Sequence, residues 1–194
     1  MTHGSGLQYR IHSRHRSDNM EKCITLGKKQ ITIRATAGVI VIYKEQFGTE
    51  YMEDTAALEF DEEGMPMTEE DGRRALTIGG QLLWAMAKAA DDSILPPVQF
   101  YEDIGSFDAD YAYSEAAELF AMSCEGADST SSGRSNEKLT SENLVTSALL
   151  CKMSYTDLCK ISVAMALNII NQYCAIKSGE EVTRKATQED FDNF

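Results

Sequence analysis

Histidine is nearly absent from this chain: three occur among 194 residues, and none follows residue 15. The body of the protein therefore lacks the usual general base, the histidine of serine–histidine and cysteine–histidine pairs, and the commonest metal ligand. The phosphate-binding, dinucleotide-binding and HExxH patterns are missing as well. We therefore expect no enzymatic activity, no cofactor and no metal site.

Paired cysteines and long apolar runs are also lacking. The five cysteines are odd in number and show no CxxC spacing, which predicts free thiols in a reducing compartment. The longest run without charge, residues 161–176, contains two asparagines and a glutamine and is shorter than the roughly 20 apolar residues of a membrane helix. No apolar signal-peptide core follows the arginines near the N-terminus. These patterns predict a cytoplasmic protein that does not contact the membrane.

Positive charge is scarce. The net charge is −13, and because residues 1–19 carry three arginines against one aspartate, it is −15 from residue 20 onward. Such a body repels phosphate backbones, so nucleic acid is not an expected partner. Residues 1–19 are polar and without periodicity, and they predict a basic disordered arm.

The N-terminal half predicts a small hairpin followed by helices. Residues 23–26 and 30–33 alternate apolar and polar side chains on either side of GKK, which indicates a β-hairpin. Residues 39–43 are four β-branched residues and a tyrosine, and this run favours a strand by propensity. Thr36, a possible N-cap, and Gly48, a possible helix end, favour a helix instead. Local reasoning leaves these two alternatives open.

Further helices are predicted from periodicity. A short helix is expected in EYMEDTAALEF and a long one over residues 68–90, with Pro96 and Pro97 ending it. The Gly79–Gly80 pair inside it costs about 1 kcal/mol per glycine relative to alanine, which indicates a kink or a close helix contact. Two shorter helical stretches follow, in VQFYEDIGSF and DYAYSEAAELFAMS, and Trp84 is expected in the core.

Small polar residues at 125–140 predict a linker. Beyond it, SENLVTSALLCK and SYTDLCKISVAMALNIINQYCAI predict a helix pair. Ser154 and Asp157 have capping-box spacing, and the expected buried stripe of the second helix is Leu158, Ile161, Met165 and Ile169. The predicted fold is mainly α with a small N-terminal β-hairpin (α+β), as two small helical modules, 20–124 and 141–194, joined by a polar linker.

Two stretches carry a family resemblance. ITIRATAGVIVIYKEQFGTEY, followed by LLWAMAKAADDSI, resembles the N-terminal domain of tail assembly chaperones from long-tailed phages and prophages of Gram-positive bacteria. That family typically shows a β-hairpin, a T-A-G helix start (here Thr36 to Gly38), an F-G helix end (Phe47 and Gly48) and an alanine-rich helix before an acidic turn (residues 85–92). The resemblance implies a helix over residues 37–47.

The second stretch, LVTSALLCKMSYTDLCKISVAMALNII with the closing RKATQEDFDNF, is similar to the short reading frame before the tape measure gene in such phages, usually joined to the first frame by a programmed frameshift. The family commonly has a glycine and an aspartate in its last long helix, where this chain has Ala164 and Asn168. The chain thus resembles the long, frameshift-fused form.

The resemblance implies a function in tail morphogenesis. Family members coat and solubilise the tape measure protein through their N-terminal part and recruit the major tail-tube protein through the extension. We therefore expect these two partners, together with a second copy of the chain, in the cytoplasm of the bacterial host and not in the mature virion. The alternative is an acidic regulator or decoy that sequesters a basic protein by imitating nucleic acid.

The closing segment is the expected partner-binding site. Asp190 and Asp192 flank Phe191, which favours docking of the ring into a basic-rimmed groove, whereas folding of both phenylalanines back onto the helix of residues 155–175 is the alternative. The candidate partner-binding residues are Arg184, Ala186, Thr187, Gln188, Asp190, Phe191, Asp192 and Phe194.

Overall fold

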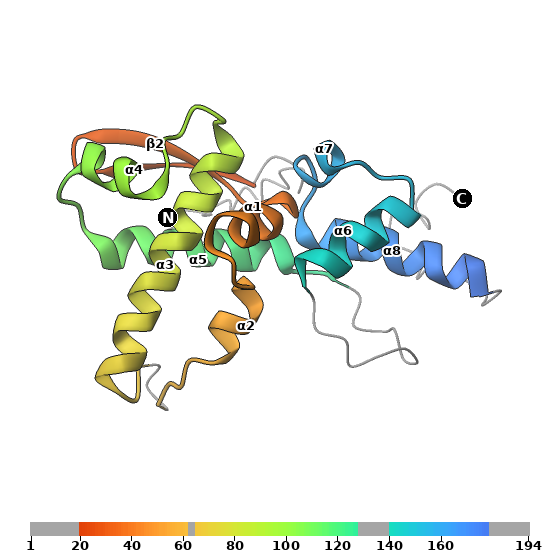
Figure 1. Cartoon of the computed structure of the whole chain (residues 1–194), viewed down its shortest axis with the longest axis horizontal. Coiled ribbons are helices and arrows are strands. Elements are labelled where there is room, and N and C mark those ends of the chain that lie inside the picture. Colours follow the sequence, from red (N-terminus) through yellow and green to blue (C-terminus); the bar gives the residue numbers. More distant parts are fainter. Residues whose placement is uncertain (1–19, 62–64, 128–139, 179–194) are drawn as a thin grey trace, which may run out of the picture.

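The computed structural model describes residues 20–61, 65–127 and 140–178, and over these it is mainly helical with one antiparallel hairpin at the N-terminal end (Figure 1). The predicted fold class is confirmed. Within the described residues the order is β1 (Glu21–Leu26), β2 (Lys29–Arg34), α1 (Gly38–Phe47), α2 (Tyr51–Ala56), α3 (Glu69–Ala90), α4 (Pro97–Ile104), α5 (Ala109–Cys124), α6 (Ser141–Leu150), α7 (Tyr155–Leu158) and α8 (Val163–Ser178).

The hairpin is confirmed, with a two-residue turn at Gly27 and Lys28. Its register pairs Ile24 with Ile31, and the alternation buries Ile24, Leu26 and Ile33 against α3 and α5. Gly27 has a φ of +59°, and a Cβ there would lie 2.9 Å from the carbonyl oxygen of Ser106. Glycine is therefore required at this turn for its backbone conformation and for its close approach to the loop between α4 and α5.

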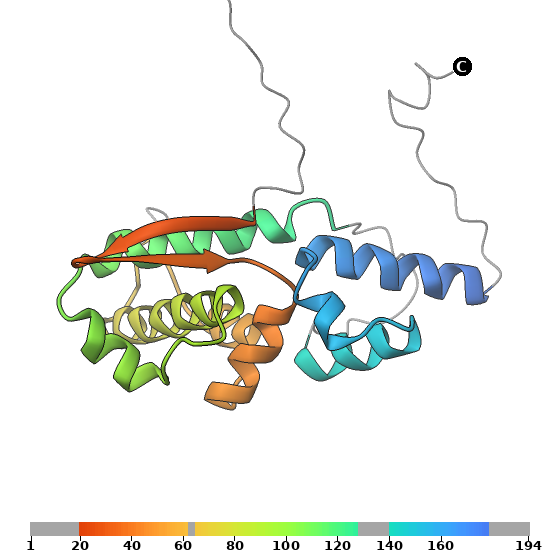
Figure 2. The ribbon, with the colours of Figure 1, turned by 90° about the horizontal axis from the view of Figure 1, so that it is seen from above.

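Residues 39–43 form a helix, so the strand suggested by propensity is wrong there. Four of these five residues are buried, because α1 lies between α3 on one side and α6 and α7 on the other (Figures 1 and 2). A helix that is apolar on nearly all sides is stable only when it is covered in this way. Gly48 ends α1 in the left-handed conformation as predicted, with φ at +76°.

Thr36 does not cap this helix. Ala37 is the N-cap residue, and no side chain accepts a hydrogen bond from the first turn. The Thr36 hydroxyl is buried and has no hydrogen-bond partner among the described residues. Instead the Ala37 N–H donates to the carbonyl oxygen of Ile161, 2.9 Å away. The backbone donor of the N-cap residue is therefore paired with the distant segment between α7 and α8.

The long helix α3 has the predicted bounds, but the prolines are not what ends it. Thr68 is its N-cap, accepting from the Asp71 N–H at 3.0 Å. At the other end Asp91 is extended and accepts from the Ser93 N–H, so α3 stops at Ala90. Pro96 and Pro97 instead begin α4, where a proline costs no hydrogen bond. Trp84 is buried, as expected, and donates to the Leu95 carbonyl.

The predicted second C-terminal helix is two helices. The capping box of Ser154 and Asp157 is present, but it starts the four-residue α7. The chain breaks before α8, so the expected stripe is wrong: Leu158 is buried, whereas Met165 is 53% exposed. The residues that α8 buries are Val163, Ala164, Ala166 and Ile170.

The C-terminal helices α6 to α8 share the hydrophobic core of the N-terminal part. Leu144, Leu158 and Val163 belong to the same cluster of buried side chains as Ile40 and Leu83. The boundaries 20–124, 125–140 and 141–194 remain a prediction, and residues 1–19 and most of the predicted linker lie outside the described residues.

Two glycines of α3 give opposite expectations for the same substitution. A Cβ at Gly79 would lie 2.9 Å from Cγ of Tyr113 on α5, whereas a Cβ at Gly72 would lie 3.9 Å from the nearest atoms, in Pro66. We expect Gly79→Ala to destabilise the protein by about 1–3 kcal/mol through overpacking. Gly72→Ala should stabilise it by about 0.5–1 kcal/mol through helix propensity. Urea unfolding of the two variants tests this, and equal effects would contradict the close helix contact.

Candidate interaction surfaces

No metal-binding cluster is found among the residues that the structure describes. They contain no group of three or more histidine, cysteine or acidic side chains able to hold a metal ion. All five cysteines are free. Burial raises the pKa of the Cys124 and Cys151 thiols, which is the opposite of the lowered pKa of an activated nucleophile. In the described part of the chain, no helix is long and apolar enough to cross a membrane.

The sequence-predicted site residues cannot be placed, since the described residues end at Ser178, the last residue of α8. Those outside are Arg184, Ala186, Thr187, Gln188, Asp190, Phe191, Asp192 and Phe194. Their role in partner binding stays a prediction. The described surface offers other candidates for protein contacts.

The first candidate is a pair of shallow, adjoining pockets on α3 that share Thr77 and Gln81 and are together called the α3 groove below. At one end its walls are mostly apolar and aromatic and come from the ends of α1, α4 and α5. The side chains and backbone that line this end belong to Phe47, Leu76, Thr77, Gly80, Gln81, Pro97, Tyr101 and Tyr113. Leu76 is 49% exposed although it is a large apolar side chain, so a partner could bury it.

Two tyrosines set the shape of this aromatic end. Gly79 and Gly80 have no side chains, so the rings of Tyr113 and Tyr101 come close to the α3 backbone. The Tyr101 hydroxyl donates to the Gly80 carbonyl oxygen at 2.6 Å. Burial raises the pKa of both tyrosines, which keeps their hydroxyls neutral. The aromatic end is thus a fixed, uncharged surface.

The other end of the α3 groove is polar and is bordered by α2. It is lined by Thr49, Asp54, Glu70, Arg73, Arg74, Thr77, Ile78 and Gln81. Asp54 is held from two sides, by the Thr49 hydroxyl at 2.6 Å and by the buried Tyr43 hydroxyl at 2.9 Å. Burial, followed by the hydrogen bond to Asp54, raises the pKa of Tyr43, so this hydroxyl remains a donor. This end carries both signs of charge, since Asp54 and Glu70 line it together with the two arginines, and Arg73 lies 3.7 Å from Glu69.

A methionine-rich surface adjoins the start of α3. Its exposed side chains are those of Met52, Phe60, Met65 and Met67, between 38% and 61% exposed. Phe60 forms a β-bridge with Pro66, and the Met67 N–H donates to the Glu59 carbonyl, so the segment turns back on itself beside α3. Methionine is flexible and polarisable and adapts to varied apolar partners. Sequence reasoning missed this surface, and its signal was the methionine spacing in GMPM.

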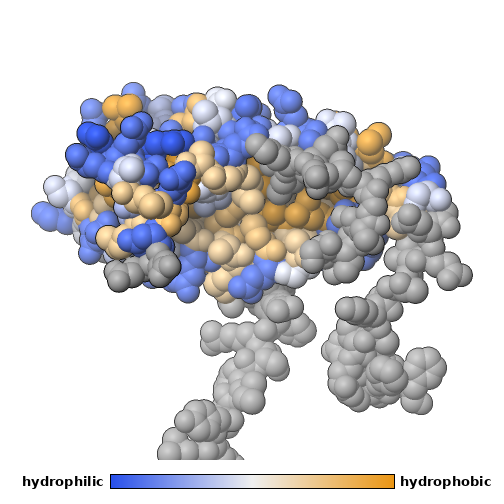
Figure 3. Space-filling view, turned by 90° about the horizontal axis from the view of Figure 1, so that it is seen from below, coloured by the Kyte–Doolittle hydropathy of each residue, from blue (hydrophilic) through white to orange (hydrophobic). Residues whose placement is uncertain are grey.

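Hydrophobic side chains also gather in a band across the middle of the face seen in Figure 3, between clusters of hydrophilic side chains. Contiguous apolar surface of this kind marks sites where other proteins bind.

The second candidate is the group of helices α6 to α8, called the C-terminal layer below. Residues 20–124 carry eight basic and 20 acidic side chains, a net charge of −12, whereas residues 141–178 carry three lysines and two acids, a net charge of +1. Leu149, Leu150, Met165 and Ile176 are all more than half exposed. The layer is therefore the least acidic part of the described protein, and it is apolar at its surface.

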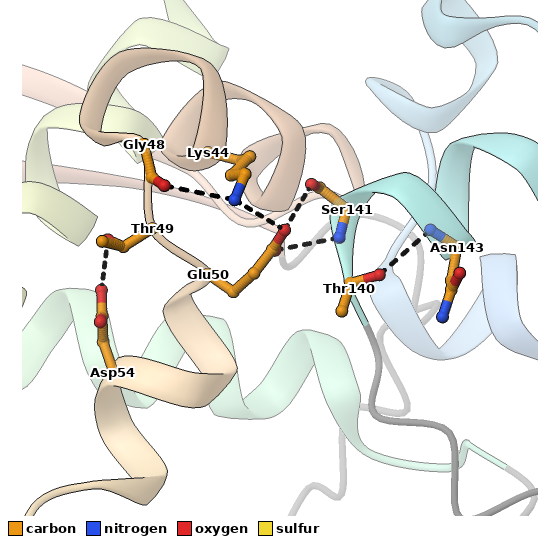
Figure 4. A network of polar contacts seen from close by, with 8 residues as sticks. All are labelled: Lys44, Gly48, Thr49, Glu50, Asp54, Thr140, Ser141 and Asn143. Atoms are coloured by element: carbon orange, nitrogen blue, oxygen red, sulfur yellow. Dashed lines mark hydrogen bonds and ion pairs between the residues drawn. The ribbon is translucent and has the colours of Figure 1, made fainter.

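A buried carboxylate fixes the C-terminal layer to the rest of the molecule (Figure 4). Glu50, the residue before α2, accepts from the Ser141 N–H at 3.0 Å and from the Ser141 hydroxyl at 2.8 Å. Ser141 is the first residue of α6, where backbone N–H groups have no partner within the helix. Lys44 of α1 lies 3.5 Å from the same carboxylate. Glu50 thus provides an acceptor and a negative charge at the N-terminus of α6.

Comparisons with protein-family models, with curated proteins and with solved structures found no match to this chain.

The Glu50–Ser141 contact predicts that substitutions of these two residues have coupled effects on the free energy of unfolding. Glu50→Gln removes the charge at the α6 N-terminus, and Ser141→Ala removes the hydroxyl donor. We expect each variant to lower the free energy of unfolding by about 1–3 kcal/mol, since hydrogen bonds to a buried charge are involved. In a double-mutant cycle measured by urea unfolding, the coupling free energy between the two substitutions should be about 1 kcal/mol or more. Additive effects would show that the two residues do not stabilise each other.

Proposed function

We propose that this protein is a tail assembly chaperone of a long-tailed phage or prophage, which coats and solubilises the tape measure protein and recruits the tail-tube protein. The observation that supports this most is the α3 groove with the methionine-rich surface beside it. The aromatic end of the groove and the methionine-rich surface expose apolar side chains, and they lie on a strongly acidic body. The sequence resemblance described above supplies the identity of the partners.

The groove suits a long amphipathic helix. Such helices bind by placing an apolar stripe, spaced every three to four residues, into a hydrophobic groove. Phe47, Leu76 and Tyr101 line the apolar end of the α3 groove, and Arg73 and Arg74 lie at the polar end. Acidic side chains that flank an apolar stripe would pair with these arginines. The methionines would accept the varied apolar side chains along a tape measure helix.

The acidic body suits the solubilising role. Exposed apolar stripes of a long helical protein aggregate, and covering them with a highly charged partner suppresses this. With a net charge of −12 on residues 20–124, neighbouring coated complexes repel each other at low salt. Coating needs no nucleotide, because the tail-tube protein displaces the chaperone as the tube polymerises.

The decoy alternative is less well supported, because many of the acids have local partners. Asp71, Asp108 and Asp157 accept hydrogen bonds in the first turns of helices. Other acids pair with basic side chains, as in Lys22–Glu115, Lys29–Asp103 and Arg34–Glu21. An imitation of nucleic acid requires acids that face a partner in dense rows, and acids in caps and ion pairs explain the composition without it.

The α3 groove can be tested with a pair of matched leucine variants. Leu76 on α3 and Leu149 on α6 are both exposed helical leucines, at 49% and 62%. In co-expression with the neighbouring tape measure protein, Leu76→Asp should reduce capture at least tenfold, because a carboxylate would enter the apolar contact. Leu149→Asp should capture as well as the unchanged chain. Equal capture by both variants would exclude the α3 groove as the binding surface.

The C-terminal segment is proposed to recruit the tail-tube protein. One or two anchored aromatic rings can dominate such an interface, at roughly 2 kcal/mol or more each. We expect the double variant Phe191→Ala and Phe194→Ala to lose capture of the tail-tube protein while its melting temperature is unchanged. If melting is lowered and capture is intact, the two rings pack onto this chain instead.

A further inference from the structure

The three methionines of the methionine-rich surface are exposed and take no part in the core. Met65 and Met67 are 60% and 61% exposed, which makes them the most exposed methionines among the described residues, and Met52 is 38% exposed. Met52 lies on α2, whose six residues are all at least partly exposed. Met86 on α3, by contrast, is 0% exposed. A small oxidant in solution therefore reaches the first three sulfur atoms but not the fourth.

Backbone groups hold the segment of Met65 and Met67 in place independently of the methionine side chains. The Asp61 N–H donates to the Met65 carbonyl oxygen at 2.9 Å, and the Met65 N–H donates to the Asp61 carboxylate at 2.8 Å. The Met67 N–H donates to the Glu59 carbonyl oxygen at 3.0 Å. A chemical change at the two sulfur atoms breaks none of these hydrogen bonds. It alters the surface that a partner meets while the fold is kept.

Hydrogen peroxide converts a methionine thioether to a sulfoxide without a catalyst. The sulfur lone pair attacks one oxygen of the peroxide, the O–O bond breaks and an S–O bond forms. The hydroxide that leaves takes the proton of the S–OH group and becomes water, so sulfur loses two electrons and the peroxide gains two. A flexible apolar side chain thereby becomes a polar one. Methionine sulfoxide reductases reverse the change, with a dithiol as the reductant.

We propose that Met52, Met65 and Met67 form a modification site, at which oxidation to sulfoxides releases the apolar helix bound on the methionine-rich surface. The inference rests on the proposed function, because that helix belongs to the tape measure protein. Thioethers pack against varied apolar side chains. A sulfoxide oxygen buried in the same contact receives no hydrogen bond from an apolar stripe, which costs binding free energy. Oxidation therefore switches binding off, and enzymatic reduction switches it on again.

The test compares the unchanged full chain with two matched variants. Leucine has nearly the volume of methionine and is not oxidised, so combining Met52→Leu, Met65→Leu and Met67→Leu keeps the surface apolar. Glutamine is polar like the sulfoxide, so the same three positions changed to glutamine imitate the oxidised surface. The probe is a fluorescent amphipathic peptide of the neighbouring tape measure protein, the tightest binder to the reduced chain among peptides that tile its length. Anisotropy gives the Kd before and after hydrogen peroxide.

We expect peroxide to raise the Kd of the unchanged chain about tenfold or more, because polar oxygens enter the apolar contact. Methionine sulfoxide reductases should restore the original Kd. The leucine variant should bind with the same Kd before and after peroxide, and the glutamine variant should bind weakly in both states. Peptide mass spectrometry should find an added oxygen at Met52, Met65 and Met67 and none at Met86. The melting temperature of the oxidised chain should be unchanged.

Two controls separate this site from other oxidisable groups. Met122 and Met165 are 43% and 53% exposed, and the variant Met122→Leu with Met165→Leu should lose binding after peroxide as the unchanged chain does. Dithiothreitol added after the peroxide reduces oxidised cysteines and leaves the sulfoxides.

Three results would overturn the inference while the proposed function stands. They are an unchanged Kd after peroxide, loss of binding by the oxidised leucine variant, and a lowered melting temperature of the oxidised unchanged chain only, which would make the three methionines part of the fold. If no peptide binds the reduced chain, the proposed function fails and this inference fails with it.

Discussion

The burial of α1 is the constraint on which the rest of the structure depends. This helix has the sequence GVIVIYKEQF, and buried side chains point from it in several directions. One neighbour cannot cover such a helix. Helix α3 covers one side, and α6 with α7 covers another. The C-terminal layer is therefore part of the core, although a polar stretch of sequence precedes it.

Both ends of α1 make close contacts, the first through a glycine and the second through an aromatic ring. Gly38 has no Cβ, and one placed there would lie 2.7 Å from Sγ of Cys159, so the segment after α7 packs directly on the start of α1. At the other end, Phe47 packs edge to face on Trp84, with ring centroids 5.6 Å apart, and also lines the α3 groove. The same helix thus supports the C-terminal layer at its start and forms part of the α3 groove at its end.

Local signals in the sequence predicted much of the secondary structure. Gly48, Thr68 and Ser154 end or begin helices through their own backbone or side-chain chemistry, and this is visible in a few neighbouring residues. Thr36 has the same local signal, but a carbonyl from residue 161 bonds the next N–H, and no local pattern reveals that partner. The break between α7 and α8 was missed for a related reason. Apolar side chains recur at helical spacing on both sides of it, so the sequence pattern shows no interruption.

The candidate surfaces were harder to predict than the helices. The α3 groove combines residues from α1, α3, α4 and α5, and only the unusual Gly79–Gly80 pair indicated that another helix comes close. The contact of Glu50 with Ser141 joins residues 91 positions apart, and neither residue type is informative by itself. In contrast, the neutrality of residues 161–176 within an acidic chain can be read directly from composition. Composition does not show which side of α8 is buried. That side is set by the packing of α5 and α6 against the helix.

The contact of Glu50 with Ser141 joins the acidic N-terminal part to the nearly neutral C-terminal layer. Glu50 is one of the 20 acids of residues 20–124, but its side chain is 7% exposed and faces the C-terminal layer. An acid buried without partners would be costly, so its pairing with Lys44 and Ser141 stabilises the docked layer. Docking in turn covers Leu144 and Ala148 of α6 and leaves Met165 and Ile176 of α8 exposed. Because α1 carries both Lys44, beside Glu50, and Phe47, in the α3 groove, the groove and the C-terminal layer belong to one continuous core.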